Sequence, residues 1–170
     1  FYPNRPATQY FGQELTYSQL KTEVDRAANV LRLAGVRRGD AVSIALPNCP
    51  QHVIVFYALM RIGAIAAEHN PLAPISEIEQ QIKRHRGKVA VVWEKSVSKF
   101  AFGPGHQLQT VFTVDITRYM PVTKKTMLAL PIAPARKARD QMRLAAPAGT
   151  LSWDDKVRAA SPIDPSTPHA

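Results

Sequence analysis

The first strong pattern in the chain is helical. Over residues 17–34, apolar side chains recur every three or four positions, which is the spacing of one buried helix face. Thr16 and Gln19 have the spacing of an N-terminal capping box, and Gly35 stands where a left-handed C-cap belongs. The pattern predicts an amphipathic helix over 17–34, preceded by a tight hairpin that turns at Gly12 and Gln13.

Four short apolar runs follow, each bounded by turn residues and containing β-branched side chains. They predict buried strands at residues 41–46, 64–68, 88–93 and 110–116. After the third strand, residues 96–102 predict a short basic helix or loop, and Gly103-Pro104-Gly105 predicts a turn.

Two helices are predicted between these strands. The first has Pro50 in its opening turn and ends near Gly63. Its apolar face comprises Val53, Phe56, Tyr57 and Met60. The second begins with a capping box formed by Ser76 and Glu79 and is closed by Gly87. Its buried face contains Ile78 and Ile82.

Strands that alternate with helices and read as continuous apolar runs predict an α/β fold, with a mostly parallel sheet and helices on both faces. In such sheets, ligands bind outside the carboxyl ends of the strands. The loops expected at those ends are 47–50, 69–74, 94–99 and 115–120.

Charge is concentrated in the second half of the chain. The net charge is +9, and residues 118–143 contribute +6 of it through seven basic residues against Asp140. A basic surface attracts polyanions such as anionic lipid, nucleic acid or a phosphate-rich cofactor. Because this segment has only Tyr119 as a stacking residue and no known nucleic-acid-binding motif, no nucleic-acid partner is expected.

Prolines divide the part of the chain beyond Tyr119 into short pieces. Residues 123–130 and 135–145 can therefore form only short helices. Ser152 is expected to cap a last helix that ends at Ala159, and residues 161–170 read as a linker. The predicted organisation is an α/β subdomain at 1–117, a basic segment interrupted by proline at 118–150, and a short helix with a linker to a downstream domain at 151–170.

No pattern of catalytic residues emerges from the sequence alone. Cys49 has no nearby histidine or acid in a catalytic spacing and reads as a core thiol. The five histidines lack the spacing of a metal site, and neither a glycine-rich phosphate loop nor a serine-hydrolase motif occurs. With one cysteine, no signal-peptide pattern and no membrane-spanning run, the chain is expected to be cytoplasmic.

Lys95 and Lys99 follow the third predicted strand at the expected ligand edge. A lysine there either meets a phosphate group as a point charge or is a solvated loop residue, and both interpretations stay open. Asn70 and Pro71 pose the same choice, because they are either a turn that stops a strand or backbone exposed at the mouth of a site.

Several motifs in residues 14–95 share their order and spacing with one enzyme family. They are Leu15-Thr16-Tyr17, residues 33–42, Leu46-Pro47-Asn48, residues 61–65 and His69-Asn70-Pro71-Leu72. In these motifs the chain resembles the N-terminal part of adenylate-forming, AMP-binding acyl-CoA synthetases. The later Tyr119-Met120-Pro121 and the basic stretch after it resemble the long-chain fatty-acid-CoA ligases.

The resemblance implies an ATP- and Mg²⁺-dependent acid-thiol ligase that joins a fatty acid to CoA through an acyl-adenylate. The family's phosphate loop and its other catalytic motifs have no match here and would lie beyond Ala170. The chain would then be an N-terminal subdomain that is inactive alone, with the missing downstream domains as its partners, and that binds none of these cofactors by itself.

The resemblance also implies that Asn70 and Pro71 border the route of CoA, and charge and topology add Lys95 and Lys99 to this loop. The basic segment predicts peripheral contact with an anionic membrane at its inner face, or else a solvated connector. The residues expected at that contact are Lys124, Lys125, Arg136, Lys137, Arg139 and Arg143. The alternative function is a non-catalytic α/β binding module whose basic arm contacts a membrane or a protein.

Overall fold

The computed structural model describes residues 2–164, so residues 165–170 of the predicted linker lie outside the described part. Its helices are α1 Tyr17–Leu33, α2 Pro50–Ile62, α3 Ile75–His85, the 3₁₀ helix η1 Glu94–Lys99, α4 Val122–Ala129, α5 Ala133–Met142 and α6 Trp153–Ala159. Its strands are β1 Pro6–Tyr10, β2 Gln13–Thr16, β3 Ala41–Ala45, β4 Ile65–Glu68, β5 Val89–Trp93, β6 Thr110–Val114 and β7 Leu151–Ser152.

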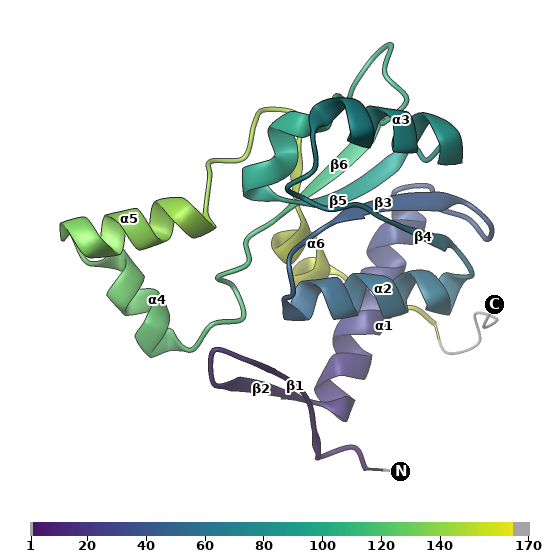
Figure 1. Cartoon of the computed structure of the whole chain (residues 1–170). Helices are drawn as coiled ribbons and strands as arrows, with labels where there is room; N and C mark the ends of the chain where they lie inside the picture. The colour runs from purple at the N-terminus through teal and green to yellow at the C-terminus, as the bar shows by residue number, and fades with distance from the viewer. Residues whose placement is uncertain (1, 165–170) are drawn as a thin grey trace.

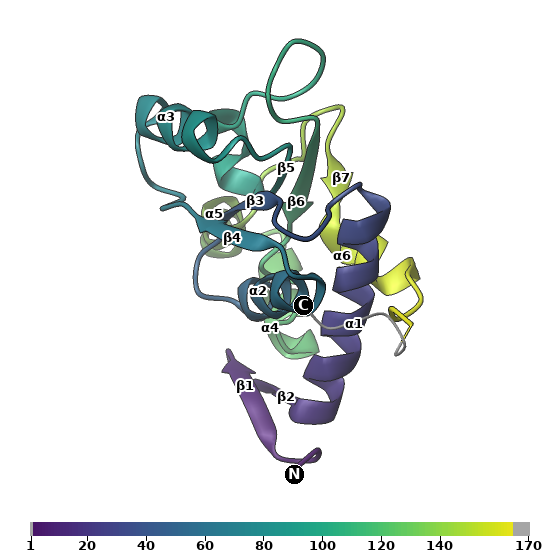
Figure 2. The same ribbon diagram turned by 90° about the vertical axis from the view of Figure 1, so that its right-hand side faces the viewer.

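The centre of the molecule is a five-stranded sheet in the order β4-β3-β5-β6-β7, in which every pair of neighbours is parallel. Helices α1, α2 and α6 cover one face, and α3 with η1 covers the other (Figures 1 and 2). The predicted α/β fold, with a parallel sheet between two helical layers, is therefore confirmed. The inner strands β3 and β5 are buried along almost their whole length, as continuous apolar runs require.

The N-terminal hairpin and helix form as predicted. The hydroxyl of Thr16 accepts a hydrogen bond from the Gln19 amide, and the side chain of Gln19 accepts one from the Thr16 amide, which completes the capping box. Gly35 has a φ of +92°, as a left-handed C-cap region requires. The hairpin turn lies one residue earlier than predicted, at Phe11 and Gly12, and both have positive φ.

The predicted face of α2 is wrong. Phe56, Tyr57 and Met60 are exposed, and the helix buries the opposite side. That buried side comprises Gln51, Ile54, Val55, Ala58, Leu59 and Ile62. Because α2 has apolar residues on both sides, periodicity alone did not distinguish them. The side with the smaller residues packs closely against α1 and the sheet.

The predicted boundaries of α3 need two corrections. The helix begins at Ile75 after Pro74, which lacks a side-chain cap, so Ser76 already lies inside the helix and forms no capping box. At the other end, Arg86 takes the left-handed cap position with a φ of 57°. Gly87 is needed for a different reason, because a Cβ there would lie 2.5 Å from the carbonyl oxygen of Ala41.

Residues 122–142 form two short helices, as the prolines predicted, and we call this segment the arm. It projects from the α/β unit (Figure 1). In α4 no residue is buried, and in α5 only Ala135 is buried. The arm is joined to the sheet at its base, where the indole nitrogen of Trp93 donates to the carbonyl oxygen of Met142 at 2.8 Å.

The end of the described chain packs into the α/β unit. Ser152 caps α6 as predicted, by accepting a hydrogen bond from the Asp155 amide. Trp153 is buried and meets the ring of Phe112 edge-on. The strand β7 was not predicted, because two residues carry no periodicity and pair only where β6 offers an open edge.

Candidate functional site

The candidate site lies at the carboxyl edge of the sheet. The loops predicted there follow β3, β4, β5 and β6, and because all four strands are parallel, they emerge at one edge. Residues after β7 join them. This edge therefore gathers side chains that are far apart in the sequence.

The loop that contains Asn70 and Pro71 is held by a hydrogen bond within the loop and by hydrogen bonds from Lys99. The side-chain oxygen of Asn70 accepts from the Leu72 amide at 2.9 Å, which forms a local turn. Lys99 donates to the carbonyl oxygens of Pro71 at 3.0 Å and Ala73 at 2.9 Å. The structure thus brings Lys99 together with Asn70 and Pro71. The hydrogen bonds of this lysine fix the backbone of the loop.

Lys95 lies in a different environment. Its ammonium group donates to the carbonyl oxygen of Asp140 in α5, so it joins η1 to the arm. It has no described contact with the loop at Asn70 and Pro71. Lys95 and Lys99, which the sequence analysis assigned to one loop, therefore contact two separate parts of the edge.

An acidic cluster that the sequence reasoning missed occupies the middle of the edge. Glu94 follows β5, Asp115 follows β6 and Asp154 follows β7. Arg143 forms ion pairs with Asp115 at 3.3 Å and with Glu94 at 3.4 Å. The available signal was Glu94 directly after the apolar run at 88–93 and Asp115 near the end of the run at 110–116, because parallel pairing brings the carboxyl ends of neighbouring strands together.

Gln51 joins this cluster from the first turn of α2 and is fully buried. Its amide nitrogen donates to the Asp115 carbonyl oxygen at 2.9 Å and to Asp154 at 3.1 Å. Asp154 also accepts from the Asp115 amide at 3.1 Å. Burial raises the pKa of Asp154 to about 6, although the hydrogen bonds from Gln51 and Asp115 lower it.

Cys49 lies beside the same edge but has the properties of a core residue. It is buried at the start of α2, and burial raises the pKa of its thiol to about 11. A thiol is nucleophilic only as thiolate, so this cysteine is unreactive near neutral pH. The geometry supports the interpretation of Cys49 as a core thiol.

Two histidines that are far apart in the sequence meet beneath α3. The Oγ of Ser43 lies 3.1 Å from Nε2 of His69 and 3.2 Å from Nε2 of His85. Nδ1 of His85 accepts from the Gly87 amide, so its Nε2 carries the proton that reaches Ser43. The Ser43 hydroxyl can then donate to His69, whose Nδ1 donates to Gln81 at 2.6 Å.

This chain of hydrogen bonds is complete only when both rings are neutral. Burial lowers the pKa of His69 and of His85, which favours the neutral form. Among residues 2–164, no group of three or more histidine, cysteine, aspartate or glutamate side chains is placed to hold a metal ion.

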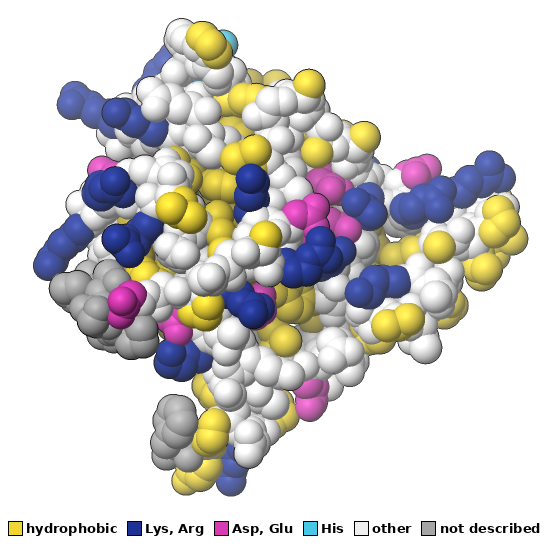
Figure 3. All heavy atoms as spheres, turned by 180° about the vertical axis from the view of Figure 1, so that it is seen from behind, with side chains coloured by type: hydrophobic (Ala, Val, Ile, Leu, Met, Phe, Trp, Pro, Cys, Tyr) yellow, Lys and Arg dark blue, Asp and Glu magenta, His cyan; other side chains and the backbone are white. Residues whose placement is uncertain are grey.

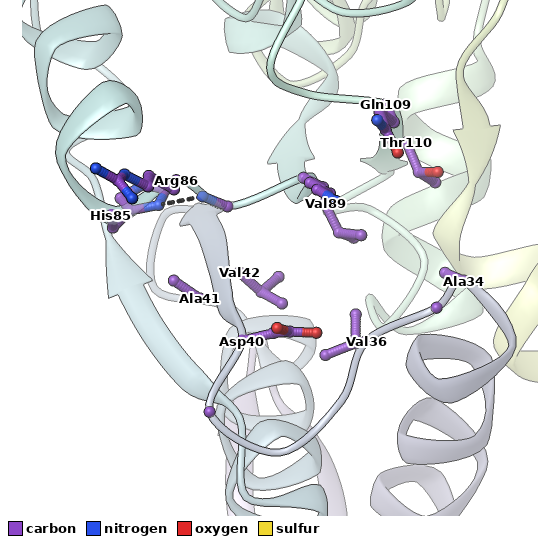
Figure 4. Close-up of a pocket in the computed structure, with 14 residues that line it drawn as sticks. Ala34, Val36, Asp40, Ala41, Val42, His85, Arg86, Val89, Gln109 and Thr110 are labelled. Atoms are coloured by element: carbon purple, nitrogen blue, oxygen red, sulfur yellow. Dashed lines mark hydrogen bonds between the residues drawn. The ribbon is translucent and has the colours of Figure 1, made fainter.

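A cavity of about 390 Å³ lies at the opposite edge of the sheet, beside Asp40, Val42, Val89 and Thr110 (Figure 4). It is at the amino ends of β3, β5 and β6. Ligands of open parallel sheets bind at the carboxyl ends, so the acidic cluster and the Asn70 loop remain the candidate site.

Fold and site together define an open parallel α/β protein with a polar carboxyl edge. The family described as AMP-binding enzyme matches residues 1–167. This chain therefore belongs to the family of AMP-binding enzymes, and the predicted resemblance is confirmed.

Among curated relatives, a long-chain-fatty-acid–CoA ligase of Bacillus subtilis (strain 168) is 28% identical over 135 residues, which cover 76% of this chain and 23% of the relative. An acetyl-coenzyme A synthetase of Rubrobacter xylanophilus is 60% identical over 50 residues, covering 29% of this chain and 8% of the relative. The crystal structure of the anthranilate CoA ligase AuaEII in complex with anthranoyl-AMP has the same fold, with a TM-score of 0.70 and 20% identity, over 94% of this chain and 26% of that chain. The chain thus spans about a quarter or less of the length of these relatives.

Proposed function

We propose that this chain is the N-terminal part of an ATP-dependent long-chain fatty-acyl-CoA ligase. The observation that carries the proposal is the extent of the match to the Bacillus ligase. A match over 76% of the chain includes the middle of the sequence and reaches α4 of the arm. The match to the acetyl-coenzyme A synthetase covers 29% of the chain and is too short to include both the edge loops and the arm.

The proposed reaction has two steps. A fatty-acid carboxylate oxygen attacks the α-phosphorus of ATP, and pyrophosphate leaves as the acyl-adenylate forms. The thiolate of CoA then attacks the acyl carbon, and AMP leaves as the thioester forms. Mg²⁺ would offset the charge of the triphosphate.

The described residues do not fit ATP or Mg²⁺. They contain no phosphate loop, and Glu94, Asp115 and Asp154 are already engaged by Arg143, Gln51 and backbone amides. We therefore assign nucleotide binding to parts of the whole protein beyond this chain. The role proposed for this chain is to hold the Asn70 and Pro71 loop, through Lys99, along the path of CoA.

The experiment compares the whole protein with the 170-residue chain. Pyrophosphate release is measured with ATP and Mg²⁺ in the presence of a long-chain fatty acid, 4-coumarate or acetate, and thioester formation is then measured after addition of CoA. We expect release to be fastest with the fatty acid, and none from residues 1–170 alone. A preference for 4-coumarate or acetate would refute the chain-length assignment. Inactivity of the whole protein with all three acids would favour a non-catalytic binding module.

We also propose that the arm contacts an anionic membrane, from which a fatty acid would be taken up. Large apolar side chains on or beside the arm are exposed. They are Val122, Met127, Leu130, Ile132 and Leu144. Seen from behind, hydrophobic and basic side chains lie next to one another on this projecting part (Figure 3). No helix among residues 2–164 is long and apolar enough to cross a bilayer.

A further inference from the structure

The arm and the loop after β6 line a cavity of about 310 Å³ that is open to solvent on one side. Its polar lining comes from three separate segments of the chain. The lining residues include Asp115, Thr117, Arg118, Lys125, Arg139 and Arg143. We propose that this cavity binds a phosphate monoester, and only the assignment of that phosphate to CoA rests on the function proposed above.

The cavity has a large excess of positive charge. Four basic residues face Asp115 as the only acidic lining residue, and within the described chain only Arg143 of the four forms an ion pair. Arg143 contacts both Asp115 and Glu94, so its charge is largely offset. Arg118 interacts with Asp154, so the net charge of the lining is carried mainly by Lys125 and Arg139.

Two of these basic groups are positioned by neutral acceptors. Lys125 donates to the carbonyl oxygen of Arg118 at 2.9 Å, and Arg139 donates to the carbonyl oxygen of Leu128 at 3.2 Å. A carbonyl group orients a cation without cancelling its charge, and each group keeps further N–H donors. The cavity thus presents oriented and uncompensated donors before any ligand arrives.

A phosphate monoester fits this arrangement better than other anions do. It carries a charge of about −1.5 to −2 near neutral pH on three acceptor oxygens, whereas a carboxylate carries −1 on two. Arginine guanidinium groups and lysine ammonium groups are the donors that commonly bind phosphate. Tyr119 is partly buried and donates to Glu23, so it is not placed to stack on a nucleic-acid base at this cavity.

Two sources can supply such a group, namely the 3′-phosphate of CoA and the headgroup of phosphatidic acid. The shared chemistry is a terminal phosphate with two ionisable oxygens. The experiment must therefore test the phosphate first and its source second.

Binding is measured by isothermal titration calorimetry on the 170-residue chain with inorganic phosphate. CoA is then compared with dephospho-CoA, and soluble dihexanoyl phosphatidic acid with dihexanoyl phosphatidylcholine. The test variant is Lys125→Gln with Arg139→Gln. The matched control is Lys124→Gln with Lys137→Gln, which removes the same charge from the same two helices at residues that do not line the cavity.

We expect saturable phosphate binding that weakens at least about tenfold in the test variant and less than about twofold in the control, because only the test variant removes charged donors from the cavity. A loss of affinity from CoA to dephospho-CoA assigns the site to CoA, and a loss from phosphatidic acid to phosphatidylcholine assigns it to lipid. Both results support the phosphate site.

If phosphate binding weakens equally in the test variant and in the control, the effect comes from the overall charge of the chain and the proposal is overturned. The proposal is also overturned if phosphate binding does not saturate. It is overturned as well if CoA binds no better than dephospho-CoA and phosphatidic acid binds no better than phosphatidylcholine. The variant Lys125→Arg with Arg139→Lys keeps the charges and should retain most of the binding. Circular dichroism spectra that match the unsubstituted chain show whether each variant is folded.

Discussion

Lys99 donates a hydrogen bond of 3.0 Å from its ammonium group to the carbonyl oxygen of Pro71. The lysine follows β5, whereas the proline follows β4, and β3 lies between these two strands in the sheet. The contact therefore bridges two loops that are not neighbours at the carboxyl edge. It explains how a basic residue at the expected ligand edge can have a role in positioning the backbone.

Replacing Lys99 by Met should destabilise the fold. The change leaves the carbonyl oxygens of Pro71 and Ala73 without their charged donor, and hydrogen bonds to charged groups contribute about 1.5–3 kcal/mol each. Because the site is only partly buried, we expect a loss of roughly 1–3 kcal/mol in the free energy of unfolding, measured by urea denaturation. Lys95→Met is the control and should cost less, because Lys95 makes one exposed hydrogen bond, whereas Lys99 makes two that are partly buried. Unchanged stability in Lys99→Met would show that the lysine is a solvated loop residue.

The pair of His69 and His85 should make the fold sensitive to acid. Both pKa values are lowered by burial from 6.5, so the unfolded chain binds more protons than the folded chain below that pH. The contribution of the pair to the free energy of unfolding is fully present above about pH 6.5. It is lost as the pH falls towards the pKa values of the folded chain.

The measurement is the free energy of unfolding from pH 8 to pH 5, for the unsubstituted chain and for His85→Gln. The variant should show a smaller loss on acidification, because one titrating ring is removed. His106→Gln is a control at an exposed histidine and should keep the original pH dependence. If His85→Gln keeps it too, the neutral hydrogen-bonded pair does not contribute to stability.

Asp154 should have the opposite pH dependence. Its folded pKa of about 6 lies above the ordinary value of 3.8, so between these values the folded chain binds more protons than the unfolded one. Stability from this group is present at low pH and is lost as the pH rises through 6. Compared with Asp154→Asn, the unsubstituted chain should gain at most about 1.4 kcal/mol per pH unit as the pH falls from 6 to 4. A constant difference between the two proteins across this range would contradict the raised pKa.

The arm should bind anionic vesicles through its basic residues. Each basic side chain near an anionic surface contributes about 1 kcal/mol, so replacing Lys124, Lys125, Arg136, Lys137 and Arg139 together by Gln should abolish most binding. Co-sedimentation is measured with vesicles that contain phosphatidylserine, and pure phosphatidylcholine vesicles serve as the control. Undiminished sedimentation of the variant would exclude the proposed membrane contact.

Local sequence signals were sufficient for most of the fold. The 3.6-residue period, the Thr16 and Gln19 capping box and Gly35 define α1 without reference to any distant residue. Likewise, apolar runs between turn residues define β3, β5 and β6, and their alternation with helices predicts the parallel sheet. These features depend on backbone conformation and side-chain spacing within about 20 residues, so they can be read from the sequence alone.

The candidate site was predicted only in part. Sequence order placed Asn70, Pro71 and Lys99 at the correct edge, because all carboxyl ends of a parallel sheet share one side. It did not reveal that Lys99 holds the loop, nor that Glu94, Asp115 and Asp154 form one cluster with Arg143. Those contacts depend on strand order and helix orientation, which local spacing does not encode.

By itself, the sequence determined most of the elements, the parallel α/β class and the membership in the AMP-binding family, because each depends on local periodicity or on the order of motifs along the chain. Only the tertiary structure decided which face of α2 is buried, that β7 extends the sheet and that His69 meets His85 across Ser43. The physical reason is that burial and pairing are set by competition among surfaces that are distant in sequence, so the choice between two locally equivalent faces is made only when the layers pack together.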